Sequence, residues 1–105
     1  MSINRIEQLH NMIKNSPTDT FLHYALGLEY IKQDNYKDAQ QSFDTVLKID
    51  NNYLPVYYQI GKLMEVLDKL DEAKKIYLSG IELARSQADM HTQKELETAL
   101  ALLDD

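Results

Sequence analysis

The chain has 105 residues, a formal net charge of −6 and no cysteine. This length allows one domain with a buried core, and the lack of cysteine excludes disulfide bonds, thiol catalysis and thiolate metal sites. The acidic balance argues against nucleic acid as a partner, because nucleic-acid binding depends on clustered lysine and arginine. Residues 1–5 contain no apolar signal segment, and no apolar run approaches the roughly 18 residues that cross a membrane. We therefore expect a cytoplasmic protein that binds neither nucleic acid nor a membrane.

Six short helices are predicted in chain order. Residues 2–15 form the first, and residues 21–31 and 36–49 show apolar positions at the i, i+3, i+4 and i+7 spacing of the next two. The segments between the predicted helices are rich in Asp, Asn and Ser, which cap helices and form turns through their own side chains. These breaks fall at residues 15–19, 34–35, 50–52, 68–69 and 86–89.

Two stretches of the chain repeat one pattern of residues. Gly27 and Gly61 lie 34 residues apart (61 − 27), and the larger residues around each glycine keep the same spacing. Self-similarity at a fixed period of this length indicates an array of structural repeats. The matched positions are His23, Leu26, Tyr30, Ala39 and Phe43 in the first copy, and Tyr57, Ile60, Met64, Ala73 and Tyr77 in the second.

The pattern resembles the tetratricopeptide repeat, whose signature is W-x2-L-G-x2-Y, then A-x3-F, then P. The resemblance covers residues 20–53 and 54–87 as whole repeats, and residues 2–15 as the second helix of a preceding half repeat. It implies an all-α fold, a right-handed α-α superhelix of helical-hairpin repeats with six helices, in a single domain of residues 1–105. The departures from the signature are His23 and Tyr57 for Trp, Met64 for Tyr, and Asn51 and Arg85 for the closing Pro.

The two repeat glycines predict a close approach between helices. Glycine in mid-helix costs about 1 kcal/mol relative to alanine, so a packing reason is expected. The missing side chain would let the first helix of each repeat lie against the second. The predicted partners are Ala39 and Ala73 across the contact, with Phe43 and Tyr77 in the space beside it.

Residues 89–103 are predicted to be a capping helix, because the repeat register fails after Gln87 and repeat arrays need atypical ends. Asp89 would cap its first turn. The alternative is a self-associating structural unit, a homodimer through the apolar stripe of this helix or through the groove of the repeats, which concentration-dependent light scattering would distinguish. The predicted inward stripe is Leu96, Ala99, Leu100 and Leu103, and the predicted water-facing residues are Gln93, Lys94, Glu95 and Glu97.

No constellation of residues predicts catalysis. The sequence has no nucleotide-binding loop, GxSxG elbow or HExxH helix. His23 stands at the signature Trp position and is interpreted as a semi-buried core residue. His91 and Glu95 share a helix face at i, i+4, but two ligands without a third make a weak metal site, and an ion pair or hydrogen bond is favoured. We expect no enzymatic activity, no cofactor and no metal.

The resemblance implies that the first helices of successive repeats line a concave groove that binds a peptide segment or protein surface. Tyr24 and Tyr58 occupy equivalent positions and would present two phenols, and aromatic side chains suit recognition surfaces. Packing against the opening helix and the cap stays an open alternative, above all for Phe21 and Leu28. The candidate groove residues are Tyr24 and Leu28 in the first repeat, with Phe21 and Ile31 beside them, and Tyr58, Gln59, Lys62 and Glu65 in the second.

Some members of the family bind the C-terminal carboxylate of heat-shock chaperones with a clamp of Lys, Asn and Arg. Carried over by position, that clamp would fall on Tyr24, Leu28, Gln59, Asp89 and Gln93. None of the five matches, and Asp89 has the opposite charge. We therefore expect a partner other than the heat-shock chaperone C-terminus.

Overall fold

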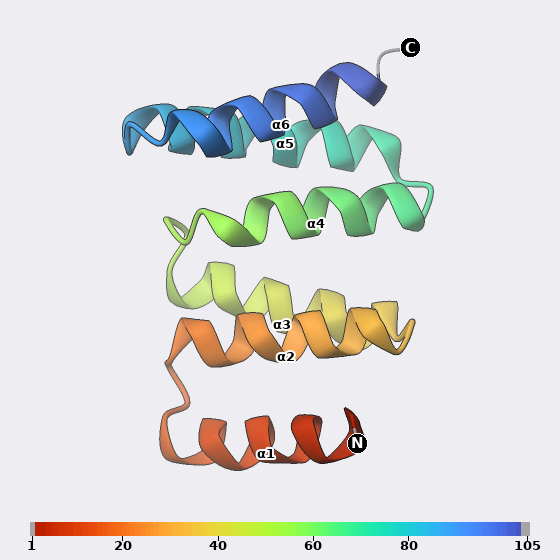
Figure 1. Cartoon of the computed structure of the whole chain (residues 1–105), viewed down its shortest axis with the longest axis vertical. Helices are drawn as coiled ribbons and strands as arrows, with labels where there is room; N and C mark the ends of the chain where they lie inside the picture. The colour runs from red at the N-terminus through yellow and green to blue at the C-terminus, as the bar shows by residue number, and fades with distance from the viewer. Residues whose placement is uncertain (1, 104–105) are drawn as a thin grey trace. The chain divides into compact units, whose positions relative to one another are not determined.

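The computed structural model describes the backbone of residues 2–103 and the side chains of residues 5–103. The described chain is all-helical and contains no strand, which confirms the predicted all-α fold of six helices (Figure 1). It divides into two compact units, residues 1–53 and residues 54–105. The helices are α1 (Ser2–Asn15), α2 (Thr20–Lys32), α3 (Tyr36–Ile49), α4 (Pro55–Val66), α5 (Leu70–Ser86) and α6 (Met90–Leu103).

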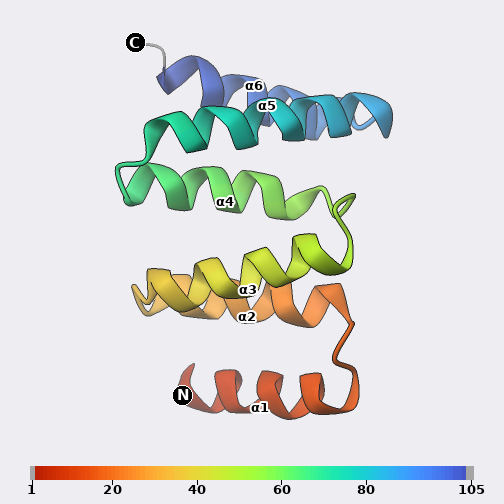
Figure 2. The ribbon, with the colours of Figure 1, turned by 180° about the vertical axis from the view of Figure 1, so that it is seen from behind.

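In the first unit α2 and α3 form an antiparallel hairpin, and α1 lies along α2 (Figures 1 and 2). Asp19 caps the start of α2, because its carboxylate accepts hydrogen bonds from the backbone amides of Phe21 and Leu22. Such a cap satisfies amides that have no partner inside the helix. Leu9 of α1 is buried with apolar residues of α2, and this cluster joins the two helices: Leu9, Leu22, Ala25 and Leu26, with Ile6, Ile13 and Tyr30 packed against it.

The turns inside the two hairpins have the same backbone geometry. Asp34 and Asp68, which are 34 residues apart, both adopt positive φ, at 58° and 59°. In each turn the next residue donates its backbone amide back to the preceding helix, from Asn35 to Tyr30 at 2.9 Å and from Lys69 to Met64 at 2.8 Å. This is a common way to end a helix, because it satisfies the last carbonyls. The sequence repeat is therefore also a repeat of backbone conformation.

In the second unit α4 and α5 form the equivalent hairpin, and α6 packs against α5 (Figures 1 and 2). Leu96 of α6 is fully buried, and Ala99 is nearly so. A Cβ atom built on Gly80 of α5 would lie 2.9 Å from the Leu96 side chain, so α6 approaches α5 closely at this glycine. The predicted stripe is thus only partly inward, since Leu100 and Leu103 are half-buried and Gln93, predicted to face water, is half-buried as well.

The repeat glycines mark close contacts, and the two aromatic residues that were predicted beside them lie there. A Cβ atom on Gly27 would lie within 3.0 Å of three ring carbons of Phe43, and one on Gly61 would meet the ring of Tyr77 in the same way. The nearest atoms thus belong to the two aromatic rings, and Ala39 and Ala73 are not among them. Each alanine is buried one turn before the ring on the same helix.

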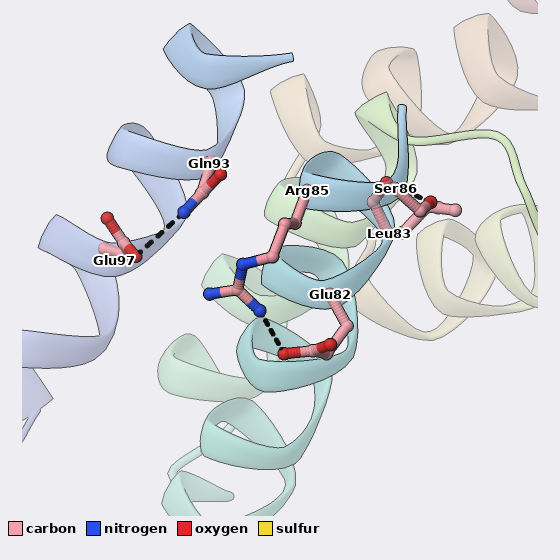
Figure 3. Close-up of polar contacts among 6 residues, drawn as sticks. All are labelled: Glu82, Leu83, Arg85, Ser86, Gln93 and Glu97. Carbon is pink, nitrogen blue, oxygen red and sulfur yellow. Dashed lines mark hydrogen bonds and ion pairs between the residues drawn. The ribbon is translucent and has the colours of Figure 1, made fainter. Parts of the chain in front are cut away.

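Helix α5 runs to Ser86 and is 17 residues long, whereas its counterpart α3 has 14 residues and ends at Ile49. After α3 the Asp50 carboxylate accepts the backbone amide of Asn52 at 2.9 Å, which turns the chain. In α5 the position that matches Asp50 is Ala84, which lies inside the helix. The last turns of α5 and the first of α6 carry polar contacts within one helix (Figure 3): Arg85 with Glu82, the Ser86 hydroxyl donating to the Leu83 carbonyl, and Gln93 donating to Glu97.

Candidate functional site

A cleft of about 340 Å³ lies between α4 and α6 in the second unit. Its wall on α4 consists of two of the predicted groove residues, Tyr58 and Lys62. The wall on α6 combines apolar and charged side chains: His91, Lys94, Glu95, Thr98, Ala99 and Leu102. This volume lies at the lower end of the range for small-ligand pockets.

Tyr58 and Lys62 form a connected pair on α4. The ring of Tyr58 packs against the ring of Tyr77 on α5, with centroids 6.5 Å apart and an interplanar angle of 44°. The Lys62 ammonium lies 5.9 Å from the Tyr58 ring centroid, a cation–π distance. The Lys62 side chain is 46% exposed. Tyr58 is therefore half-buried and fixed by its neighbour, whereas the ammonium reaches the solvent.

Glu65 has a structural partner and does not line the cleft. The phenol of Tyr77 donates a hydrogen bond to its carboxylate, and the Lys62 ammonium lies 3.8 Å from the same carboxylate oxygen. Burial and then this hydrogen bond raise the pKa of the Tyr77 phenol. In the first repeat the matching residues are Ile31 and Phe43, an apolar pair. Glu65 thus supplies the acceptor that a buried phenol needs.

The other predicted groove residues do not line this cleft. Gln59 is half-buried on α4 and does not line it. Tyr24 and Leu28 lie on α2 of the first unit, where the Tyr24 ring packs between Phe43, at 6.1 Å, and Tyr53, at 5.4 Å. The contact of Tyr24 with Phe43 repeats that of Tyr58 with Tyr77. Equivalent sequence positions thus make equivalent packing contacts in the two units.

The α6 wall was not predicted as part of a binding site. The side chains of Lys94 and Glu95 are exposed, as predicted, but they border the cleft together with Thr98 and Leu102. His91 lies 3.9 Å from Glu95, the ion-pair geometry favoured for this i, i+4 pair. One signal was available in the sequence, because α6 follows the second repeat in the place where a third repeat would have its first helix.

A smaller cleft of about 250 Å³ lies in the first unit, and its residues make local polar contacts. His23 is half-buried, as predicted, and its Nε2 donates to the Pro17 carbonyl at 2.9 Å. His10 Nε2 lies 3.1 Å from the hydroxyl of Tyr30, which joins α1 to α2.

Within the described residues no three His, Cys, Asp or Glu side chains gather as a metal site would require. The same residues contain no helix long and apolar enough to cross a membrane.

Helical hairpins repeated at 34 residues, with an open cleft between two of the helices, define a class of repeat proteins that serve as protein-interaction modules. The family signature described as "Tetratricopeptide repeat" matches residues 30–96, and the chain belongs to this family. No curated protein matches the sequence.

Solved structures agree with this assignment. A tetratricopeptide repeat domain protein from Salinibacter ruber is 37% identical with a TM-score of 0.77, over 82% of this chain and 96% of the other. The type III secretion translocator chaperone SycD from Yersinia enterocolitica gives a TM-score of 0.89 at 12% identity, over 98% and 72% of the two chains. The first such domain of Spaghetti (RPAP3), bound to the HSP90 peptide SRMEEVD, gives 0.75 at 21% identity, over 95% and 82%.

Proposed function

We propose that this protein binds a peptide segment of a partner protein in the cleft between α4 and α6, without catalysing a reaction. The observation that carries the proposal is the composition of the cleft. A fixed aromatic ring, Tyr58, faces the apolar residues Ala99 and Leu102 of α6, and ammonium groups stand beside them. Apolar surface with a few placed polar groups is typical of ligand sites, and Leu102 is 67% exposed and available for contact.

The structural relatives support a peptide as the ligand class. The repeat domain of RPAP3 carries an HSP90 peptide, and SycD is a chaperone of secreted translocators. The HSP90 peptide itself is not the ligand we propose. Asp89, which falls on a clamp position, accepts the amide and hydroxyl of Thr92 at 3.0 and 2.9 Å and so caps α6. Its carboxylate would also repel the terminal carboxylate of such a peptide.

Self-association through the α6 stripe is the alternative, and the structure weakens it. Leu96 and Ala99 are buried inside the second unit, so these two residues cannot pair with another copy. The burial of these two residues leaves less apolar surface on α6 for a dimer. Light scattering distinguishes peptide binding from self-association. A monomer at every concentration agrees with peptide binding, whereas a stable dimer agrees with self-association.

Blocking the cleft tests the proposal. Thr98 is exposed and lines the cleft, so Thr98→Trp should fill it without disturbing the core. Ala101 is exposed on the same helix and lies outside the cleft, and Ala101→Trp is the matched control. Affinity capture from the native lysate with quantitative mass spectrometry should retain the same proteins on the parent and on Ala101→Trp, and lose them on Thr98→Trp. Equal retention on all three proteins would show that the partner binds elsewhere.

A further inference from the structure

We propose that the segment bound in this cleft is acidic, with a carboxylate between Lys62 and Lys94 and an aliphatic side chain against Tyr58 and Leu102. This inference rests on the proposed function and specifies its ligand. Two ammonium groups line the cleft against one carboxylate, that of Glu95. The chain as a whole carries a net charge of −6, so this cationic site stands out from an acidic protein.

The ion pairs within the protein leave the ammonium groups of Lys62 and Lys94 available to a ligand. Glu95 lies 3.9 Å from His91 on its own helix, so its nearest cationic or imidazole partner is His91 and not one of the two lysines. Glu65 accepts the hydrogen bond of Tyr77 and lies 3.8 Å from Lys62, a long ion pair with a shared acceptor. Lys94 is exposed and forms no ion pair with any side chain between residues 5 and 103. A ligand carboxylate would therefore not have to break a strong contact first.

The charge of a peptide determines how well it fits beside the two lysines of the cleft. A basic segment would place like charges beside Lys62 and Lys94, which is unfavourable. A neutral segment would use the apolar wall but leave the ammonium groups without a partner. An acidic group satisfies both lysines, and the aromatic ring and Leu102 add a contact for a neighbouring aliphatic side chain. The carboxylate can come from an internal Asp or Glu or from the C-terminus of a partner, and both present the same anionic oxygens.

Selection from random octapeptides displayed on phage tests this ligand class. One library carries the octapeptide at a free C-terminus, and a second carries it within a loop without a free end. The purified full chain serves as bait, beside Lys94→Glu, the control Lys75→Glu and the blocked variant Thr98→Trp. Lys75 is exposed on α5 and lies outside the cleft. Both lysine variants replace a lysine with glutamate, so they have the same net charge and differ only in where the charge changes. Binding of single selected peptides is then measured by fluorescence anisotropy.

We expect the parent and Lys75→Glu to enrich peptides with Asp or Glu beside an aliphatic residue. Lys94→Glu should weaken such peptides by roughly tenfold, because a carboxylate then meets repulsion in place of attraction. Enrichment in both libraries identifies an acidic side chain as the source, and enrichment confined to free ends identifies the terminal carboxylate. Neutral or basic peptides that Thr98→Trp fails to bind would overturn the acidic ligand and keep the proposed function. No peptide retained above the Thr98→Trp background would overturn both.

Discussion

Adding a single methyl group at Gly61 should reveal how closely α4 and α5 pack. Gly61→Ala introduces a Cβ atom that would lie within 3.0 Å of three ring carbons of Tyr77. Helix propensity alone favours alanine by about 1 kcal/mol, whereas overpacking a core costs about 1–3 kcal/mol. Tyr77 is fully buried, so its ring has little room to move away. We expect Gly61→Ala to be neutral or destabilised by up to about 2 kcal/mol, and Gly61→Leu to be destabilised by more.

A double-mutant cycle separates the two contributions. Tyr77→Leu removes the ring and keeps an apolar side chain, although it also loses the hydrogen bond to Glu65. In that background the methyl group of Gly61→Ala meets no ring, and the propensity gain of about 1 kcal/mol should reappear. The coupling free energy between the two sites should then be about 1–3 kcal/mol. Urea unfolding followed by circular dichroism measures each corner of the cycle.

The other glycines supply internal controls. Gly27→Ala should behave like Gly61→Ala, because Phe43 occupies the equivalent place. Gly80→Ala should be milder, since its Cβ atom would lie 2.9 Å from the Leu96 side chain and 3.0 Å from Tyr57 Cβ, whereas the one at Gly61 would lie closer to the Tyr77 ring. Close packing would be refuted if Gly61→Ala stabilised the parent by the full propensity gain. It would also be refuted if the stability change at Gly61 were the same with and without the ring of Tyr77.

Three further predictions concern α6 and the turn before it. Leu96→Ala should lower the free energy of unfolding by about 2–5 kcal/mol, because Leu96 is fully buried, whereas exposed Glu97→Ala should change it by less than about 0.5 kcal/mol in urea unfolding. Ala88 adopts φ of 56°, so Ala88→Gly should raise the melting temperature by removing strain of about 1 kcal/mol; an unchanged or lower value would contradict that strain. Hydrogen bonds from Thr92 lower the pKa of Asp89 below 3.8, so its stabilisation is present above pH 4 and lost in more acidic solution. Asp89→Asn should keep the cap but flatten that pH dependence, and an unchanged acid limb in thermal melts would contradict this origin.

The sequence predicted the helices well because local signals set their ends. Asp19 caps α2 through its own side chain, and Asp34 and Asp68 close the two hairpins with the same backbone geometry. The aromatic core was also readable from the 34-residue period, since Phe43 and Tyr77 are both fully buried. These features depend on a few neighbouring residues, and their spacing is visible without any knowledge of how the helices pack.

The cleft was only half predictable, because it depends on packing between helices. Tyr58 and Lys62 follow from the repeat register, but Lys94 borders the cleft only through the placement of α6 beside α4. The periodicity of a helix shows which face is buried and not which neighbour its exposed face meets. Glu65 was assigned to the groove from register alone. The accompanying change from phenylalanine to Tyr77 was the missing signal, since a buried phenol requires an acceptor.

Helix α6 contributes both to the stability of the second unit and to the proposed binding site. One face of this helix buries Leu96 against α5, and the adjacent face presents Lys94 and Thr98 to the cleft. A ligand that contacts both α4 and α6 would bind only when α6 is docked, so it would also stabilise the docked cap by mass action. The reverse also holds, because a substitution that loosens Leu96 removes one wall of the site without touching a ligand. Loss of binding is therefore informative about recognition only in variants such as Lys94→Glu, whose side chain lies outside the core.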